Sequence, residues 1–124
     1  MNIERVDIFA TLKKWWGYEG FRPGQQQVIE SVVAGRDTLA LMPTGAGKSL
    51  LYQVPTMARE GLCIVVTPLV ALMKDQVDAL RRRHINAVAI HSGLSSRQID
   101  IALDNCVYGD VKFLYIDFTV KFFR

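Results

Sequence analysis

One short stretch of this sequence, Met42–Ser49, has the residue types and spacing of a phosphate-binding loop. It reads Met-Pro-Thr-Gly-Ala-Gly-Lys-Ser, so two glycines precede a lysine and a hydroxyl residue. Gly45 and Gly47 can adopt positive φ and let the backbone close around a phosphate, because they carry no Cβ. The lysine can reach the β- and γ-phosphates, and the hydroxyl can coordinate Mg²⁺. The sequence therefore predicts binding of a nucleoside triphosphate together with a magnesium ion.

The positions of this loop have separate expected roles. Backbone N–H groups from Gly45 to Ser49 would point toward the phosphates at a helix N-terminus, which carries about half a positive charge. Lys48 is the candidate catalytic residue, and Ser49 would hold Mg²⁺ through the nucleotide. The candidate phosphate-binding residues are Thr44, Gly45, Ala46, Gly47, Lys48 and Ser49. The alternative is a chance Gly-x-Gly-Lys-Ser turn, since the full pattern has glycine where Met42 stands.

The flanking segments favour the phosphate loop over a chance match. Asp37–Leu41 is typical of a short apolar strand before the loop, and Leu50–Val54 of the first turns of a helix after it. A strand, a tight glycine loop and a helix N-terminus form the layout that such a loop requires. Pro55 would interrupt the helix, at a cost of about 3 kcal/mol unless a kink is wanted.

Further helices and strands alternate along the chain. Ile3–Trp16 has a helical period and would end at Gly17, and Pro23 suits the first turn of a second helix. Ser95 and Gln98 form a capping-box pair that would start the last helix. The remaining expected helices cover residues 69–83 and 95–107, and the remaining expected strands cover residues 62–66, 87–90 and 111–116.

Strands that alternate with helices predict an α/β fold with a parallel sheet wrapped by helices. The segment Leu62–Val66 is apolar throughout, which favours a strand covered on both faces. Ligands bind such sheets at the carboxyl edge of the strands. Three loops would meet at that edge, namely Pro43–Ser49, Thr67–Leu69 and His91–Gly93. A nucleotide at the first loop would therefore lie beside two loops able to contact another ligand.

Composition limits the classes of function. The chain has 124 residues, half of them hydrophobic, which is enough for one small domain at most. No run of about 18 apolar residues could span a membrane, and the acidic residues near the N-terminus do not suit a secretion signal. We therefore expect a cytoplasmic protein, associated with the nucleoid if bacterial. The net charge of +3 permits an anionic partner without requiring one.

Two other features have a structural and a functional interpretation. Cys63 and Cys106 lie far apart without zinc-ligand spacing, which favours ordinary buried thiols. The run Arg81–Arg83 could contact a nucleic acid, but three cations at the end of an amphipathic helix also complement the helix dipole. We favour the dipole explanation for the arginine run.

Three motifs of the chain resemble those of RecQ-type DNA helicases of superfamily 2. They are Phe21–Gln25, Met42–Ser49 and Thr67–Val77, and they occur in the order of that family. The resemblance covers residues 18–116 and implies an incomplete RecA-like (P-loop NTPase) domain, a three-layer α/β/α arrangement around a parallel sheet. A helix over residues 1–17 would precede this domain and an off-pattern tail over residues 117–124 would follow it. The first glycine of the phosphate loop is commonly replaced in this superfamily, so Met42 fits the resemblance.

The resemblance also implies which residues contact the base of ATP. Tyr18 corresponds to an aromatic that stacks on adenine, Arg22 to a neighbouring contact, and Gln25 to the residue that reads the adenine edge. A side-chain amide offers the donor and the acceptor that adenine N6 and N7 demand. Without the flanking motif, Gln25 would rather be a solvated polar residue, because Gln26 and Gln27 adjoin it. The implied cofactors are ATP and Mg²⁺.

Contacts with single-stranded DNA are implied as well. Thr67–Leu69 and the helix behind them resemble the motif that holds the DNA backbone, and a helix N-terminus with a threonine hydroxyl suits a phosphate without reading sequence. Ser92 and Gly93 fall where the family has another backbone-contacting turn. Lys74 lies a turn or more inside the helix, where an exposed lysine without a DNA role is equally consistent. The candidate nucleic-acid residues are Thr67, Pro68, Leu69, Lys74, Ser92 and Gly93.

The chain departs from the family after Ile116. The family continues with a small residue and then Pro-Glu-Arg, whereas this sequence reads Asp117–Arg124. It contains neither the Asp-Glu-x-His box that binds Mg²⁺ nor the second RecA-like domain with its arginine finger. An alternative takes Phe113–Asp117 as the acidic metal-binding strand, but Phe118 stands where a catalytic glutamate is wanted.

Three functions follow as hypotheses. The first is the N-terminal ATP-binding piece of a RecQ-type 3′–5′ DNA helicase, which acts in recombination and repair. Alone, this piece would neither hydrolyse ATP usefully nor unwind DNA, because phosphoryl transfer relies on metal and arginine, and translocation on two domains. The second is a stand-alone, non-catalytic ATP-binding regulatory module. The third, a small-molecule kinase, is disfavoured by the Phe21–Gln25 loop.

Overall fold

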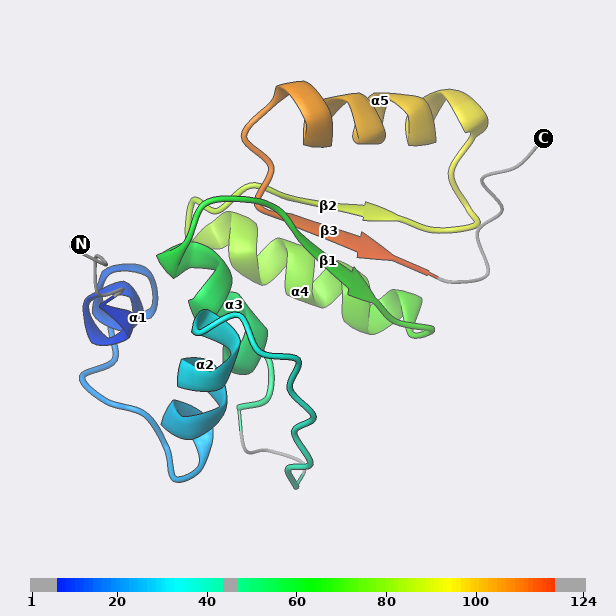
Figure 1. Ribbon diagram of the computed structural model, residues 1–124. Coiled ribbons are helices and arrows are strands. Elements are labelled where there is room, and N and C mark those ends of the chain that lie inside the picture. The colour runs from blue at the N-terminus through cyan, green and yellow to red at the C-terminus, as the bar shows by residue number, and fades with distance from the viewer. Residues whose placement is uncertain (1–6, 44–46, 118–124) are drawn as a thin grey trace. The chain divides into compact units, whose positions relative to one another are not determined.

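The computed structural model describes residues 7–43 and 47–117, and the chain divides into two compact units between Gly61 and Leu62. In chain order the elements are α1 Ile8–Trp16, α2 Gln25–Val33, α3 Leu50–Ala58, β1 Cys63–Val66, α4 Val70–Arg82, β2 Ala87–Ile90, α5 Ser96–Tyr108 and β3 Phe113–Ile116 (Figure 1). The described part of the first unit is helical, and the sheet belongs to the second unit. None of the helices described here is long and apolar enough to cross a membrane.

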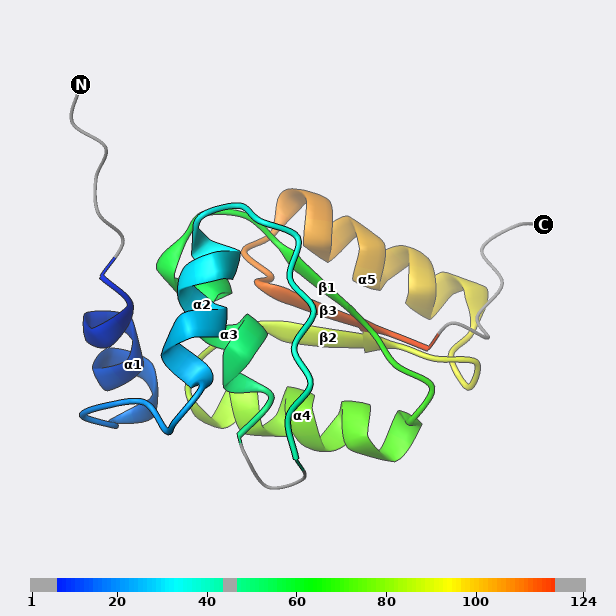
Figure 2. The same ribbon diagram turned by 60° about the horizontal axis from the view of Figure 1, so that its bottom comes forward.

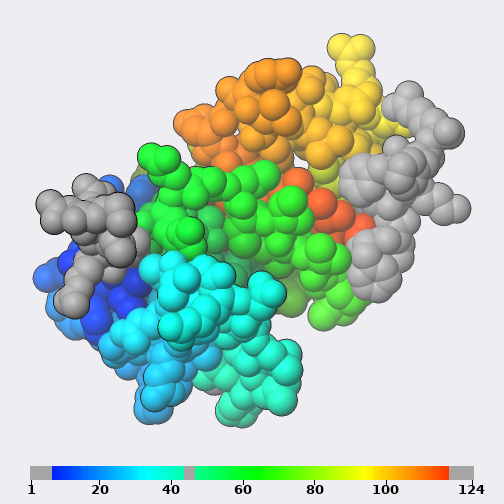
Figure 3. Space-filling model, viewed as in Figure 1, coloured from blue at the N-terminus to red at the C-terminus, as the bar shows by residue number. Residues whose placement is uncertain are grey.

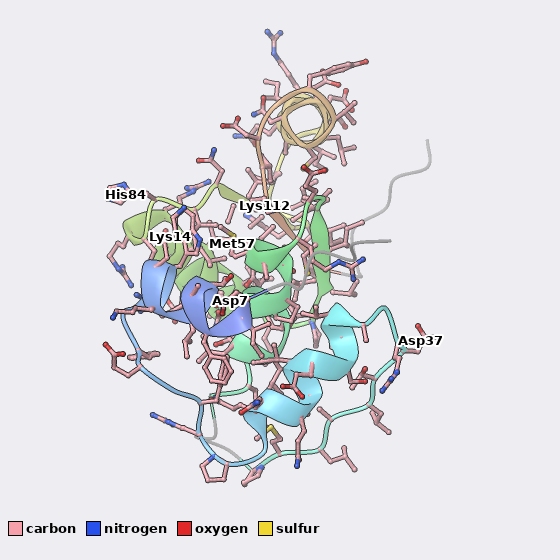
Figure 4. The ribbon with its side chains drawn as sticks, turned by 60° about the vertical axis from the view of Figure 1, so that its left-hand side comes forward. Asp7, Lys14, Asp37, Met57, His84 and Lys112 are labelled. Carbon is pink, nitrogen blue, oxygen red and sulfur yellow. The ribbon has the colours of Figure 1, made fainter. Side chains whose placement is uncertain are left out.

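Helix α1 is defined by its two ends and by one apolar face. The Asp7 carboxylate caps the helix by accepting a hydrogen bond from the Ala10 N–H at 2.9 Å. Gly17 ends it with φ 75°, as predicted, and the Gly17 N–H donates to the Lys13 carbonyl at 3.0 Å. Figure 4 shows Asp7 near one end of α1 and Lys14 toward the other. The predicted start at Ile3 lies outside the described residues. The buried face consists of Ile8, Leu12 and Trp16.

Helix α3 is the centre of the first unit, because both α1 and α2 pack on it. The predicted interruption at Pro55 is wrong, since the helix continues through this residue. Tertiary packing overrides the local penalty of proline, because the ring is buried in the unit. The Thr56 hydroxyl adds a hydrogen bond in the same turn by donating to the Tyr52 carbonyl at 2.7 Å. The buried residues of α3 are Leu51, Gln53, Val54 and Pro55.

The segment Asp37–Leu41 was predicted to be a strand and is irregular in the structure. Leu39 and Leu41 are 86 % and 88 % exposed, and Figure 4 shows the Asp37 side chain pointing outward. A strand persists only where its backbone groups pair with a neighbour, and this segment pairs with none of the described strands. The prediction is therefore wrong, because an apolar pattern does not supply the partner that a strand requires.

The second unit is built on a parallel sheet with the strand order β1-β3-β2, which confirms the predicted α/β class with three strands instead of four. Phe113 of β3 pairs with Cys63 of β1 and with Ala87 of β2, so the three strands are in register from their first residues. Helices α4 and α5 lie on opposite faces of the sheet (Figures 1 and 2). Three residues of the central strand are buried in the core of this unit, namely Phe113, Leu114 and Tyr115.

Strand β1 is not covered on both faces, which contradicts the prediction from its continuous apolar sequence. Ile64 and Val66 are 58 % and 62 % exposed. The strand lies at one edge of the sheet, and α5 packs chiefly on β2. Helix α5 itself has no buried side chain, and its outer side is exposed in the space-filling view (Figure 3). A continuous apolar run therefore shows that a strand is hydrophobic, but it does not show which face of the strand a neighbouring element covers.

The sequence patterns of α4 and α5 are confirmed. Helix α4 is amphipathic, as expected: its inner face buries Met73, Val77 and Leu80, whereas Leu72 on the margin of that face is 46 % exposed. At the start of α5, the Ser95 hydroxyl accepts from the Gln98 N–H at 3.1 Å. The Gln98 side-chain oxygen in turn accepts from the Ser95 N–H at 2.8 Å, which completes the predicted capping box.

Replacing the capping serine tests this helix start. Ser95→Ala is expected to lower the free energy of unfolding by about 1 kcal/mol, because the Gln98 N–H loses its acceptor. Ser96→Ala is the matched control, since Ser96 is the first helical residue and makes no side-chain hydrogen bond to a described residue. Urea denaturation followed by circular dichroism measures both variants, and equal losses would contradict the capping role.

Leu39 provides a test of the unpaired segment. Leu39→Ser is expected to change the free energy of unfolding by less than about 0.5 kcal/mol, because the leucine is already exposed. Ile29→Ala is the buried reference, with an expected loss of about 2–5 kcal/mol. A loss of similar size for Leu39→Ser in the same denaturation experiment would show that this segment is buried in solution.

Candidate nucleotide-binding site

The described end of the phosphate loop leads directly into helix α3. Gly47 has φ 73°, a conformation that favours glycine. Ser49 is the N-cap residue, and the Leu50 N–H donates to the Gly47 carbonyl at 3.3 Å. The predicted transition from a glycine loop to a helix N-terminus is therefore present. The other predicted phosphate-binding residues, Thr44, Gly45 and Ala46, lie outside the described residues.

The donors at this helix N-terminus are available for an anion. The backbone N–H groups of Gly47, Lys48 and Ser49 donate no hydrogen bond to another residue within 7–43 or 47–117. The same holds for the Ser49 hydroxyl, and Lys48 is exposed without an ion pair in those ranges. Unpaired N–H groups in the first turn of a helix attract anions. The donor set of amides, one hydroxyl and one ammonium group fits a phosphate chain with its Mg²⁺.

Gln25 joins the predicted base-reading loop to the phosphate loop. Its side chain is 1 % exposed, so the interpretation as a solvated polar residue is wrong. The Gln25 side-chain oxygen accepts from the Arg22 N–H at 2.8 Å. The Gln25 side-chain nitrogen donates to the Gly47 carbonyl at 3.2 Å. The amide thus uses its acceptor on one loop and its donor on the other.

Gly47 has to be a glycine because of this contact as well as its φ. A Cβ at this position would lie 2.5 Å from the Gln25 side-chain nitrogen and 4.0 Å from an Arg22 guanidinium nitrogen. A side chain would therefore displace Gln25 from the loop. The structure brings together three residues that the sequence placed on two separate motifs.

The loop before α2 is a tight turn that holds Arg22. The Gln25 N–H donates to the Arg22 carbonyl at 3.1 Å, and Gly24 is the N-cap residue with φ 86°. Pro23 therefore lies in this turn, and its predicted place in the first helical turn is wrong. Tyr18 is 50 % exposed, so its ring is accessible to a base, and its stacking on adenine stays a prediction.

Sequence reasoning missed an aromatic pair beside this turn. The ring centroids of Phe9 and Phe21 lie 5.1 Å apart, with the ring planes tilted by 58°. Phe9 belongs to α1, and Phe21 directly precedes Arg22. The periodicity of α1 gave no signal for this contact, because Phe9 lies beside the buried face of the helix and its partner follows after the helix has ended.

The second unit places the predicted DNA-contacting segments at one edge of its sheet. The three strands end in register, and the Thr67 N–H extends the pairing by donating to the Ile116 carbonyl at 3.0 Å. Thr67–Leu69 and His91–Gly93 therefore share the carboxyl edge, as predicted. That the phosphate loop adjoins the same edge stays a prediction.

Side chains fix the shape of both edge segments. The Thr67 hydroxyl accepts from the Leu69 N–H at 3.2 Å, where Leu69 is the N-cap of α4, and it retains its own O–H as a donor. His91 Nδ1 accepts from the Gly93 N–H at 3.1 Å. The predicted DNA-contacting residues that are exposed are Pro68, Leu69, Lys74, Ser92 and Gly93.

The arginine run ends α4, as the dipole explanation expects. Arg81 has a structural contact that sequence reasoning missed, because its Nε donates to the Ala87 carbonyl at 3.0 Å. This bond ties the end of α4 to the first residue of β2. It depends on the turn at His84, whose φ of 64° is rare for a residue other than glycine.

The remaining candidates are two thiols and one acid. Cys63 and Cys106 are free thiols, and both are partly exposed where buried thiols were expected. Partial burial raises the pKa of the Cys106 thiol. Asp117 is 4 % exposed, and its N–H donates to the Ile90 carbonyl at 3.0 Å. No cluster of three or more histidine, cysteine or acidic residues suited to a metal occurs in the part of the chain that the structure describes.

Known proteins are similar to this chain over most of its length. The family profile of the DEAD/DEAH box helicases matches residues 22–116. The ATP-dependent DNA helicase RecQ of Synechocystis sp. is 42 % identical over 113 residues, which are 91 % of this chain and 24 % of that protein. RecQ of Haemophilus influenzae is 40 % identical over 114 residues, which are 92 % of this chain and 18 % of that protein. RecQ of Bacillus subtilis is 46 % identical over 108 residues, which are 86 % of this chain and 18 % of that protein.

The chain spans between about a fifth and a quarter of the length of these relatives. The matched region contains the phosphate loop, Gln25 and both edge segments of the sheet, so the likeness includes the candidate site. The resemblance to RecQ-type helicases inferred from three motifs is confirmed. Because the family profile covers most of the sequence, the chain belongs to the DEAD/DEAH box helicase family.

Proposed function

We propose that this chain is an ATP-binding part of a RecQ-type ATP-dependent 3′–5′ DNA helicase that works in recombination and repair. The observation that carries the proposal is the contact of the buried Gln25 amide with Gly47, beside a helix N-terminus whose N–H groups have no partner among the described residues. The relatives are ATP-dependent DNA helicases, which supports ATP as the nucleotide and DNA as the substrate of the longer protein. Action on DNA would place the protein in the cytoplasm, at the nucleoid in a bacterium.

ATP would use both sides of the Gln25 contact. Its adenine would meet Tyr18, Arg22 and Gln25, and its phosphates would meet the amides of residues 45–49. Lys48 would neutralise charge on the β- and γ-phosphates, and the Ser49 hydroxyl would hold the Mg²⁺ that accompanies them. Reading the adenine edge would engage the side-chain amide of Gln25, the same group that contacts both loops.

Binding without useful turnover is the proposed activity of this chain alone. Phosphoryl transfer depends on stabilising the charge of the transition state, and an arginine finger by itself contributes about 10³–10⁵ in rate. The sequence contains no Asp-Glu-x-His box, and translocation along DNA requires two domains that close on the nucleotide. Single-stranded DNA would bind weakly at most, through Thr67–Leu69, Lys74 and the Ser92–Gly93 turn.

The alternative proposal is a stand-alone ATP-binding regulatory module without catalysis, which would use the same nucleotide site. The two proposals differ in their relation to DNA. A helicase part is expected to bind ATP with a different affinity when single-stranded DNA is present, whereas a module that does not bind DNA is not. A titration of ATP with and without an oligonucleotide separates them.

Lys48 is the first test of the nucleotide site. Lys48→Ala is expected to weaken binding of Mg·ATP by about 1.5–3 kcal/mol, the contribution of one charged hydrogen bond. Lys74→Ala is the matched control, because Lys74 is an exposed lysine outside the phosphate loop. Isothermal titration calorimetry measures all three proteins. Equal affinity of the wild type and Lys48→Ala would remove the phosphate-loop assignment.

Gln25 is tested by an isosteric change. Gln25→Glu replaces the donor that faces the Gly47 carbonyl at 3.2 Å with an oxygen, so the two loops repel each other. Affinity for Mg·ATP is expected to fall about tenfold or more, since leaving a buried polar group unpaired costs about 1–3 kcal/mol. Gln27→Glu makes the same change at an exposed position of the same helix. If both variants bind ATP like the wild type, the Gln25 contact has no role in the site.

A turnover assay tests the proposal that this chain alone binds ATP without hydrolysing it. Release of inorganic phosphate from ATP by this chain is expected to stay at background, with or without single-stranded DNA, for want of the metal-binding acids and the arginine. A coupled phosphate assay measures the rate. Steady release that disappears in Lys48→Ala would show that the chain hydrolyses ATP and would contradict the proposal of binding alone.

A further inference from the structure

We infer that Phe9 of α1 is a positioning residue for recognition of the base, acting through Phe21 on the turn that holds Arg22 and Gln25. The inference rests on the proposed function, because it assumes that a base binds beside this turn. It adds a residue outside the three motifs and gives α1 a role in base selectivity.

The contact between the two rings has the geometry of a favourable aromatic pair. A centroid separation of 5.1 Å with a tilt of 58° lies in the range in which the edge of one ring meets the face of the other. Phe9 is 44 % exposed and Phe21 is partly exposed. The pair therefore lies at the surface of the first unit, on the side of the turn that leads to Arg22.

Phe9 is not needed to bury α1. The core face of that helix consists of Ile8, Leu12 and Trp16, which are at most 8 % exposed, and the helix start is capped separately by Asp7. Helix α1 is thus held in the unit without help from Phe9. This makes it a fixed support on which Phe21 can rest.

The turn that Phe21 enters has no regular structure of its own. Residues 18–24 belong to no helix or strand. An ion pair between α1 and this segment joins Lys13 and Glu19 at 3.5 Å. The two side chains are 68 % and 82 % exposed, and such exposed pairs contribute little to stability. The aromatic contact is therefore the stronger of these two links between α1 and the loop.

From Phe21 the contacts continue to the phosphate loop. The next residue, Arg22, is bonded through its N–H and its carbonyl by Gln25, and the Gln25 side chain bonds Gly47. Loss of the Phe9 ring would loosen the segment that ends in Arg22, whereas Gln25 is the first residue of α2 and would keep its bond to Gly47. The phosphate-binding amides and Lys48 would keep their own support from α3, so the phosphate part of the ligand would be bound as before.

The test compares a ligand with a base and a ligand without one. Isothermal titration calorimetry of the full chain with Mg·ATP and with Mg·tripolyphosphate is carried out for the wild type, Phe9→Ala, Phe9→Tyr and Lys14→Ala. Lys14 lies on the same helix, over the Trp15 ring at 4.9 Å, and controls for surface changes on α1. Thermal unfolding of each variant checks that it is folded.

Phe9→Ala is expected to weaken the binding of Mg·ATP about three- to tenfold, the scale of one aromatic pair. The binding of Mg·tripolyphosphate is expected to weaken less than about twofold. Phe9→Tyr keeps the ring and is expected to bind ATP like the wild type, as is Lys14→Ala. If Phe9→Ala does not fold, Phe9→Leu is expected to show the same selective loss, because it keeps an apolar side chain without the ring.

An unchanged affinity for ATP in Phe9→Ala, or in Phe9→Leu if that variant is used, overturns the inference. Equal losses for ATP and tripolyphosphate overturn it too, because they indicate general damage to the unit. A wild type that binds neither ligand overturns the proposed function itself. Lys48-dependent binding of ATP that is insensitive to Phe9 overturns the inference alone.

Discussion

The candidate site depends on one buried side-chain amide. Gln25 is almost fully removed from solvent, so its oxygen and nitrogen must find partners inside the protein. They find them on two loops, the Arg22 N–H on one and the Gly47 carbonyl on the other. Because the energetic penalty for an unpaired buried amide is high, the loop next to the base and the loop next to the phosphates are tied together before any ligand binds.

Patterns confined to neighbouring residues predicted much of the fold. Strand β2 has the predicted bounds, and the capping box of Ser95 and Gln98 forms with both of its hydrogen bonds. The failures concern features that depend on distant partners. Asp37–Leu41 has an apolar pattern but no strand to pair with, and Ile64 of β1 is exposed because no neighbour within the sheet or α5 covers it. Pro55 stays helical because its surroundings bury it.

The site divides in the same way. The phosphate loop could be found from the sequence because its glycines, lysine and serine are adjacent. The resemblance to RecQ-type helicases identified Gln25, but it did not predict the hydrogen bond from Gln25 to Gly47, which is 22 positions away. Nor could the sequence show that Phe9 meets Phe21, since that contact forms only when the chain turns back after Gly17. Side-chain contacts of this kind require coordinates.

The most direct test of a site formed by Gln25 and the start of α3 is a titration of the ¹⁵N-labelled protein with Mg·ATP, followed by amide chemical shifts. The account predicts the largest changes at the backbone amides of Gly47, Lys48 and Ser49 and at the side-chain amide of Gln25. Amides on the outer side of α5 should not move. Unchanged shifts at these four residues while others respond to ATP would contradict the account.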